Sequence, residues 1–171
     1  MKSIAGMSVL ITGGGSGIGR DCARRFCEQG ARVTISGRRM DKLEAVQAEL
    51  GAQCEIVQGD VTVQADREMM LTAALHHGDG NLHALINNAA NMYRQPVDGY
   101  EEDFLKDAFN TNVVSAMMLS SMAVAPLERT EGAIVFIGST HTRRAFPGAS
   151  PYATTKAALE GLTKVMAAEL G

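Results

Sequence analysis

The sequence predicts an α/β fold in which a doubly wound parallel sheet carries helices on both of its faces. Short apolar segments alternate with helical segments along the whole chain, without a linker, an internal repeat or a low-complexity tract. Buried apolar strands that alternate with helices indicate parallel strands covered on both sides. The 171 residues, of which 46% are hydrophobic and 20% charged, predict one domain over residues 1–171 with a single sizeable core.

Five strands and five helices follow one another in this pattern. Each expected strand is built around adjacent apolar residues, and the strands fall at residues 7–12, 32–36, 55–58, 82–87 and 133–138. The expected helices fall at residues 16–29, 41–50, 65–77, 100–125 and 152–170. Asp98 followed by Glu101 is a capping signature for the fourth helix. Ser150 and Pro151 are typical of an N-cap and a first helical residue, so they predict the start of the fifth.

Composition excludes several classes of function. A net charge of −3 without any block of Lys or Arg argues against a nucleic-acid surface. The three cysteines are too few and too unevenly spaced for a disulfide framework or a zinc site, and no metal site is expected. The first residues lack the apolar core of a signal peptide, and the longest apolar stretch, residues 113–127, is too short to span a bilayer. We therefore expect a cytoplasmic protein with reduced thiols and no membrane partner.

A glycine-rich turn lies between the first expected strand and the first expected helix. It reads Thr-Gly-Gly-Gly-Ser-Gly-Ile-Gly over residues 12–19. The spaced G-x-G-x-x-G fingerprint and the phosphate-loop pattern both fail here, and T-G-x-x-x-G-x-G remains. Glycines at such a turn permit a tight bend, and the helix N-terminus that follows receives a pyrophosphate. The turn predicts a Rossmann-like dinucleotide site, and the alternative is a merely flexible turn.

The end of the second expected strand bears on the choice of cofactor. An acidic residue there would hold a ribose 2′-hydroxyl, whereas an Arg would accommodate a 2′-phosphate. This sequence has Arg38 and Arg39 and no carboxylate before Asp41. Two guanidinium groups favour NADP over NAD, although the same residues could form a solvated turn.

Tyr152 and Lys156 stand four residues apart on the last expected helix, which places both side chains on one face. A phenol has an ordinary pKa of about 10, too high for efficient proton exchange at neutral pH. An ammonium group held close by stabilises the phenolate and makes the phenol a usable general acid or base. The alternative is that an amphipathic helix carries Tyr and Lys at this spacing by chance.

The glycine-rich turn and the Tyr-Lys pair together resemble the short-chain dehydrogenase/reductase family, in its classical type, and the resemblance extends over essentially the whole chain in the order of that family. Asp60-Val61 resembles the pair that meets the adenine ring, and Asn87-Asn88-Ala89-Ala90 resembles the Asn-Asn-Ala-Gly segment, with Ala90 in place of Gly. The cofactor-binding residues that the resemblance and the cofactor argument predict are Gly13, Ser16, Gly17, Ile18, Gly19, Arg38, Asp60, Val61, Asn87, Ala89, Tyr152 and Lys156.

The resemblance also implies an activity: hydride transfer between a nicotinamide cofactor and the carbon of an alcohol, ketone or aldehyde. Tyr152 would exchange the hydroxyl proton, and Ser139 would hydrogen-bond the same substrate oxygen. Lys156 would assist Tyr152 and bind the nicotinamide ribose, and Asn112 would hold a water of the proton relay. His141 could line the substrate pocket or be an ordinary loop histidine. Specificity would come from loops near residues 91–100 and 140–150, which do not name the substrate.

The chain stops where the helix that carries Tyr152 would end, so it is C-terminally truncated relative to the family. Five strands are expected, the later strands are absent, and residues 134–137 should form an edge strand. The alternative function is therefore a truncated, inactive dinucleotide-binding or subunit-association module. The helices near 100–125 and 152–170 are unusually apolar. They predict a homodimer or homotetramer through these helices, or burial within one subunit.

Overall fold

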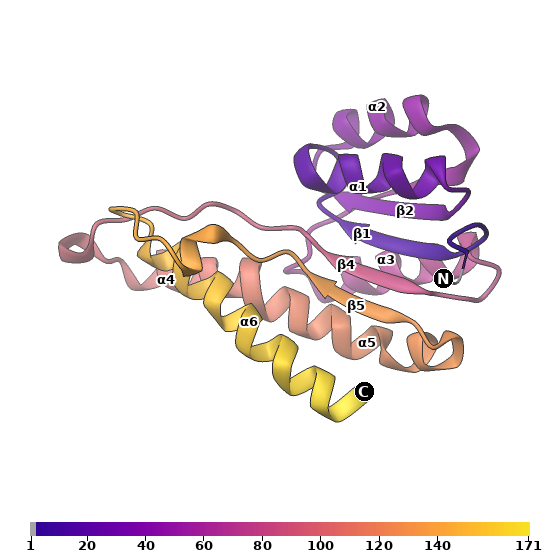
Figure 1. Ribbon diagram of the computed structural model, residues 1–171. Coiled ribbons are helices and arrows are strands. Elements are labelled where there is room, and N and C mark those ends of the chain that lie inside the picture. The colour runs from indigo at the N-terminus through magenta and orange to yellow at the C-terminus, as the bar shows by residue number, and fades with distance from the viewer. Residues whose placement is uncertain (1–2) are drawn as a thin grey trace.

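Five parallel strands form one sheet in the computed structural model, which describes residues 3–171 (Figure 1). Their order across the sheet is β3-β2-β1-β4-β5, and every neighbouring pair is parallel. The strands are β1 (Ser8–Thr12), β2 (Arg32–Gly37), β3 (Cys54–Gln58), β4 (Ala84–Asn87) and β5 (Ala133–Phe136). The doubly wound parallel sheet expected from the alternating pattern is confirmed, and β5 is an edge strand as expected.

Helices cover both faces of this sheet. They are α1 (Gly17–Glu28), α2 (Met40–Leu50), α3 (Gln64–His77), α4 (Glu102–Phe109), α5 (Ser115–Thr130) and α6 (Ser150–Leu170). One core contains residues of α1 and α2 against the sheet, including Leu43, and a second contains residues of α3 and α5, including Leu119. Figure 1 shows α1 and α2 on one side of the strands and α5 on the other. Strands β1, β3 and β4 supply residues to both cores, because alternate side chains point to opposite faces.

The fourth expected helix is in fact two helices joined by a π-helical turn, η3 (Asn110–Val114), which sequence periodicity did not predict. It also runs past Pro126 to Thr130, whereas the sequence predicted an end at residue 125. Pro126 and Leu127 are both buried, so packing favours the continued helix over the break that proline would otherwise cause.

Both capping predictions are wrong in detail. Asp98 lies in a separate 3₁₀ turn, η2 (Val97–Gly99), and the N-cap of α4 is Glu101, which makes no side-chain capping bond within the described chain. The N-cap of α6 is Ala149, so Ser150 is already helical, and its hydroxyl pairs instead with the hydroxyl of Tyr100. At the start of α4, the N–H of Glu101 donates to Gln95 Oε1 at 3.2 Å.

Together α4, η3 and α5 form one continuous helix, Glu102–Thr130. Within residues 3–171 it is the one helix whose length and composition would allow it to cross a membrane. Its most apolar window is 44% buried inside the structure, and core helices of soluble proteins pass the same test of length and composition.

The strand order fixes where a ligand binds. The chain winds outward in one direction from β1 to β3 and in the other from β4 to β5, so the switch point lies between β1 and β4. Ligands of open α/β sheets bind at the carboxyl ends of the strands at such a switch point. The glycine-rich turn after β1 and the segment after β4 meet there.

Candidate active site

The glycine-rich turn is locked against the segment that follows β4. Asn88 Nδ2 donates to the carbonyl oxygens of Thr12 and Gly13 at 2.9 and 3.1 Å. Gly13 has a φ of +67°, which other residues rarely adopt. A Cβ atom on Gly19 would lie 2.5 Å from the Gly13 carbonyl oxygen. Only glycine therefore allows α1 to pack this closely against the turn.

The N-terminus of α1 remains open for a ligand. Ser16 is its N-cap residue, and its side chain forms no capping bond to the N–H groups of the described helix. The Ser16 hydroxyl accepts instead from Arg39 Nη2 at 3.3 Å. Free N–H groups and the positive end of the helix dipole favour an anion at this position. The residues present therefore fit a pyrophosphate.

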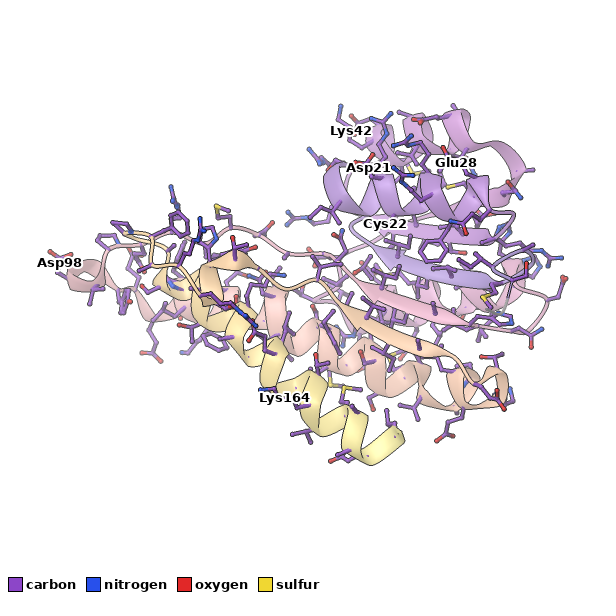
Figure 2. All side chains as sticks on the ribbon, viewed as in Figure 1. Asp21, Cys22, Glu28, Lys42, Asp98 and Lys164 are labelled. Carbon is purple, nitrogen blue, oxygen red and sulfur yellow. The ribbon has the colours of Figure 1, made fainter. Side chains whose placement is uncertain are left out.

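A cavity of about 530 Å³ opens beside this turn at the switch point. Its walls include seven of the predicted cofactor residues: Gly13, Ser16, Ile18, Arg38, Asp60, Val61 and Ala89. The cavity also contains residues that the sequence reasoning did not assign: Gly37, Arg39, Lys42, Gly59, Asn88 and Thr111 are among them. Lys42 could have been found, because it is a basic residue three positions after Arg39, the N-cap residue of α2. Figure 2 shows its side chain near the start of α2.

Five predicted cofactor residues lie outside the walls of this cavity: Gly17, Gly19 and Asn87, and the pair Tyr152 and Lys156 on α6. Gly17 and Gly19 belong to the first turn of α1, and their lack of a side chain serves the bend and the close approach to the turn. Asn87 is 6% exposed, and its Nδ2 donates to Ser120 Oγ at 3.0 Å. The side chain of Asn87 thus ties β4 to α5.

The basic residues at the cavity differ in how far they are neutralised. Arg38 Nη1 lies 3.8 Å from the carboxylate of Asp60. Arg39 is held at the glycine-rich turn by its bond to Ser16. The charge of Arg39 therefore stays available to an incoming phosphate at the turn. The charge of Arg38 is partly neutralised by Asp60.

Asn112 lies in the π-helical turn η3 and is 1% exposed. Its Oδ1 accepts from the N–H of Asn91 at 2.9 Å, and its Nδ2 donates to the Asn91 carbonyl and to Thr155 Oγ1, both at 3.0 Å. The amide thus joins the segment after β4 to α6. A π turn inserts one residue and frequently marks a functional site.

Ser139 and Tyr152 are connected through His141. The Ser139 hydroxyl lies 3.2 Å from His141 Nδ1 and also accepts from the backbone N–H of His141 at 3.2 Å. The His141 ring meets the Tyr152 ring edge to face, with centroids 5.3 Å apart and an angle of 89°. Its other neighbour is Phe146, on which it stacks at 4.3 Å.

Lys156 is 2% exposed and lies one turn after Tyr152. Its Nζ donates to the carbonyl of Ile137 at 2.7 Å and lies 5.8 Å from the centre of the Tyr152 ring. Burial lowers the pKa of Lys156, because desolvation disfavours its charged form. An ammonium held between the end of β5 and a phenol ring can stabilise a phenolate.

The four residues predicted to be catalytic are therefore joined by a chain of contacts. Asn112 binds Thr155, which directly precedes Lys156, and Lys156 binds Ile137, which is two residues before Ser139. His141 then connects Ser139 to Tyr152. The tertiary structure assembles a phenol, an ammonium and a hydroxyl near the carboxyl end of β5.

Comparison with known proteins gives the family. A family model described as short chain dehydrogenase matches residues 7–171. This chain belongs to the short-chain dehydrogenase family. The family uses NAD(P) cofactors, and its members are dehydrogenases and reductases. Gluconate 5-dehydrogenase of Gluconobacter oxydans strain 621H is 34% identical to this short-chain dehydrogenase over 99% of the chain and 67% of the relative. D-erythrulose reductase of Gallus gallus is 33% identical over 99% of the chain and 67% of the relative.

Solved structures show the same fold. One, described as a short chain dehydrogenase/reductase family protein, aligns with a TM-score of 0.91 at 32% identity, covering 99% of this chain and 71% of that one. A short chain dehydrogenase from Bacillus anthracis strain Ames Ancestor aligns with a TM-score of 0.89 at 30% identity, covering 97% and 70%. The chain spans about two thirds of the length of the curated relatives it matches.

Proposed function

We propose that this protein is an NAD(P)-dependent oxidoreductase that interconverts a small alcohol and its ketone or aldehyde. The observation that carries the proposal is the contact chain that gathers Ser139, Tyr152 and Lys156. Through Asn112 this chain reaches Asn91, which lines the cavity fitted to a dinucleotide. The family membership supports the same reaction class, because the relatives described above are dehydrogenases and reductases.

The bound nicotinamide cofactor would supply or accept the hydride, and the protein's own groups would manage the proton. Tyr152 would give its hydroxyl proton to a carbonyl oxygen during reduction and take it back during oxidation. Lys156 would stabilise the phenolate left on Tyr152, from a position one helical turn away. Ser139 would donate a hydrogen bond to the oxygen on which negative charge develops, the role in which a fixed donor contributes most to catalysis. Asn112 would keep the segment after β4 docked against α6.

Replacing Tyr152 by Phe tests this assignment. General acid catalysis contributes roughly a hundred- to ten-thousandfold, so Tyr152→Phe should lower kcat for carbonyl reduction by that factor. The Kd for NADPH, measured by thermal shift, should change by less than about twofold. Lys156→Met should also lower kcat, because the phenolate of Tyr152 loses its ammonium neighbour. Lys164→Met is the matched control, since Lys164 lies two helical turns further along α6 and is exposed (Figure 2). Retained turnover in Tyr152→Phe would remove Tyr152 from the mechanism.

We infer that NADP is the preferred cofactor. Arg39, Ser16 and Lys42 surround one part of the cavity, and Arg39 reaches the Ser16 hydroxyl. Arg39→Ala should weaken NADPH binding about tenfold or more, because a charge-assisted contact to phosphate is lost, and should leave NADH binding nearly unchanged. Arg38→Ala is the matched control and should have a smaller effect, since Asp60 already shares its charge. Tighter binding of NADH than of NADPH by the unmodified protein would refute the preference.

We also propose that a second copy of this chain covers the exposed apolar stripe of α5. This stripe begins at Val114, the last residue of η3, and continues with Met117 and Met118 on α5; all three lie at helical spacing and are 44–45% exposed. Val165 on α6 is 56% exposed. Met117→Glu would place a charge in such an interface and should shift the sedimentation coefficient to that of a monomer. An unmodified protein that sediments as a monomer at micromolar concentration would refute this.

The alternative of an inactive binding or association module has less support. A module that only bound a nucleotide would need neither the phenol nor the ammonium at the end of β5. The relatives at 33–34% identity are a dehydrogenase and a reductase. Cofactor binding without turnover across a panel of ketones and aldehydes would favour the module.

A further inference from the structure

His141 contacts two of the residues assigned to the chemistry and belongs to none of the family motifs discussed above. Its Nδ1 lies 3.2 Å from the Ser139 hydroxyl, and its ring stands edge to face with that of Tyr152. Phe146 stacks on its other side at 4.3 Å with an interplanar angle of 28°. The ring is therefore held by two aromatic neighbours while one nitrogen faces the serine.

The hydrogen-bond capacity of Ser139 decides what this contact does. A hydroxyl has one proton to donate and two lone pairs that accept. One lone pair of Ser139 is already taken by the backbone N–H of His141 at 3.2 Å. In the neutral tautomer with its proton on Nε2, His141 Nδ1 carries no proton and Ser139 donates to that nitrogen. When Nδ1 is protonated, it donates to the second lone pair, and the Ser139 proton is then free to point elsewhere.

We propose that His141 is a positioning residue whose protonation turns Ser139 into a hydrogen-bond donor toward the substrate oxygen. The inference rests on the proposed function, in which Ser139 stabilises the oxygen that gains negative charge. With Nδ1 unprotonated, Ser139 must first break its bond to the histidine before it can donate to that oxygen. With Nδ1 protonated, the hydroxyl is aligned in advance and no bond is lost.

The other charged groups near His141 come from its own segment and from α6. Arg143 and Arg144 follow in the same segment, and Lys156 lies 5.8 Å from the ring centre of Tyr152. The carboxylate of Glu160 accepts from Thr142 Oγ1 at 2.7 Å, so it lies against the residue next to His141. Imidazole is the side chain that ordinarily changes its charge between about pH 5 and 8.

The first test is a pH profile of kcat/KM for carbonyl reduction with NADPH. His141→Phe keeps a ring between Phe146 and Tyr152 and removes the nitrogen. At pH 8 we expect this variant to exceed the unmodified protein by about three- to tenfold, which corresponds to one ordinary hydrogen bond. The gap should close as the pH falls to 6. His76→Phe, on the exposed side of α3, is the control and should follow the unmodified protein. Parallel profiles for the unmodified protein and His141→Phe would overturn the proposal.

The second test needs no turnover. In protein labelled with ¹⁵N-histidine, the ring-nitrogen resonances of His141, assigned by their loss in His141→Phe, report which nitrogen is protonated. Ser139→Ala should move the Nδ1 resonance and leave those of the other histidines in place. An unchanged Nδ1 resonance would overturn the hydrogen bond and with it the proposal. An unmodified protein that reduces no carbonyl would instead refute the proposed function, and the two failures are thereby distinguished.

Discussion

Replacing Asn112 by Ala tests whether this residue is a structural anchor of the site. The substitution removes three hydrogen bonds of 2.9–3.0 Å that join the segment after β4 to α6. Asn112 is 1% exposed, so water cannot readily replace them. At about 1 kcal/mol net for each bond, we expect the free energy of unfolding to fall by about 3 kcal/mol. For a chain of this size that corresponds to a fall in Tm of roughly 6–12 °C.

Urea unfolding followed by circular dichroism, without cofactor, measures this effect on the fold alone. Asn110→Ala is the matched control, because Asn110 is exposed on the same π-helical turn, and it should change stability by less than about 0.5 kcal/mol. Asn112→Asp keeps the acceptor for the Asn91 N–H but sets a carboxylate oxygen against the Asn91 carbonyl, so we expect at least as large a loss. If Asn112→Ala matched Asn110→Ala in stability, the anchoring role would be refuted.

Three further predictions concern the turn, the buried lysine and the thiols. Gly19→Ala would place a Cβ 2.5 Å from the Gly13 carbonyl, so we expect lower stability and NADPH binding weakened at least tenfold in a thermal-shift titration; unchanged binding would contradict the close approach. Burial puts the folded-state pKa of Lys156 below its unfolded value of 10.5, so the charged form opposes folding and that penalty is relieved as pH rises toward 10.5. The stability of the unmodified protein relative to Lys156→Met should thus increase between pH 7 and about 10 in urea unfolding; a constant difference would contradict this. Burial raises the pKa of Cys54 to about 12, so half-buried Cys22 should be alkylated first at pH 8, as peptide mass mapping would reveal; earlier labelling of Cys54 would contradict its burial.

Much of the site could be predicted because its residues follow strand ends. Gly13 and Ala89 follow β1 and β4, and parallel strands bring their carboxyl ends to one edge of the sheet. The glycine at position 13 also carries its own physical reason, a positive φ. Tyr152 and Lys156 were predicted as a pair because helical spacing fixes their relation to one another.

The predictions that failed depended on a choice between local and distant partners. Ser150 carries the side chain of an N-cap, yet its hydroxyl pairs with Tyr100, which lies 50 residues earlier. The amide of Asn87 also donates to a distant residue, Ser120 on α5, and the part of Asn87 in cofactor binding stays a prediction. Local propensity is worth about 1 kcal/mol at such positions, and a tertiary hydrogen bond of similar strength can redirect it.

By itself, the sequence determined the doubly wound sheet, the glycine-rich turn and the spacing of the Tyr-Lys pair. These features are local, because hydrophobic periodicity, backbone freedom and helical geometry act over a few residues. Only the tertiary structure decided that Arg38 shares its charge with Asp60 and that Asn112 bridges two segments. It also decided that His141 lies between Ser139 and Tyr152. Those contacts join atoms from separate elements, and their distances are set by how the helices pack on the sheet.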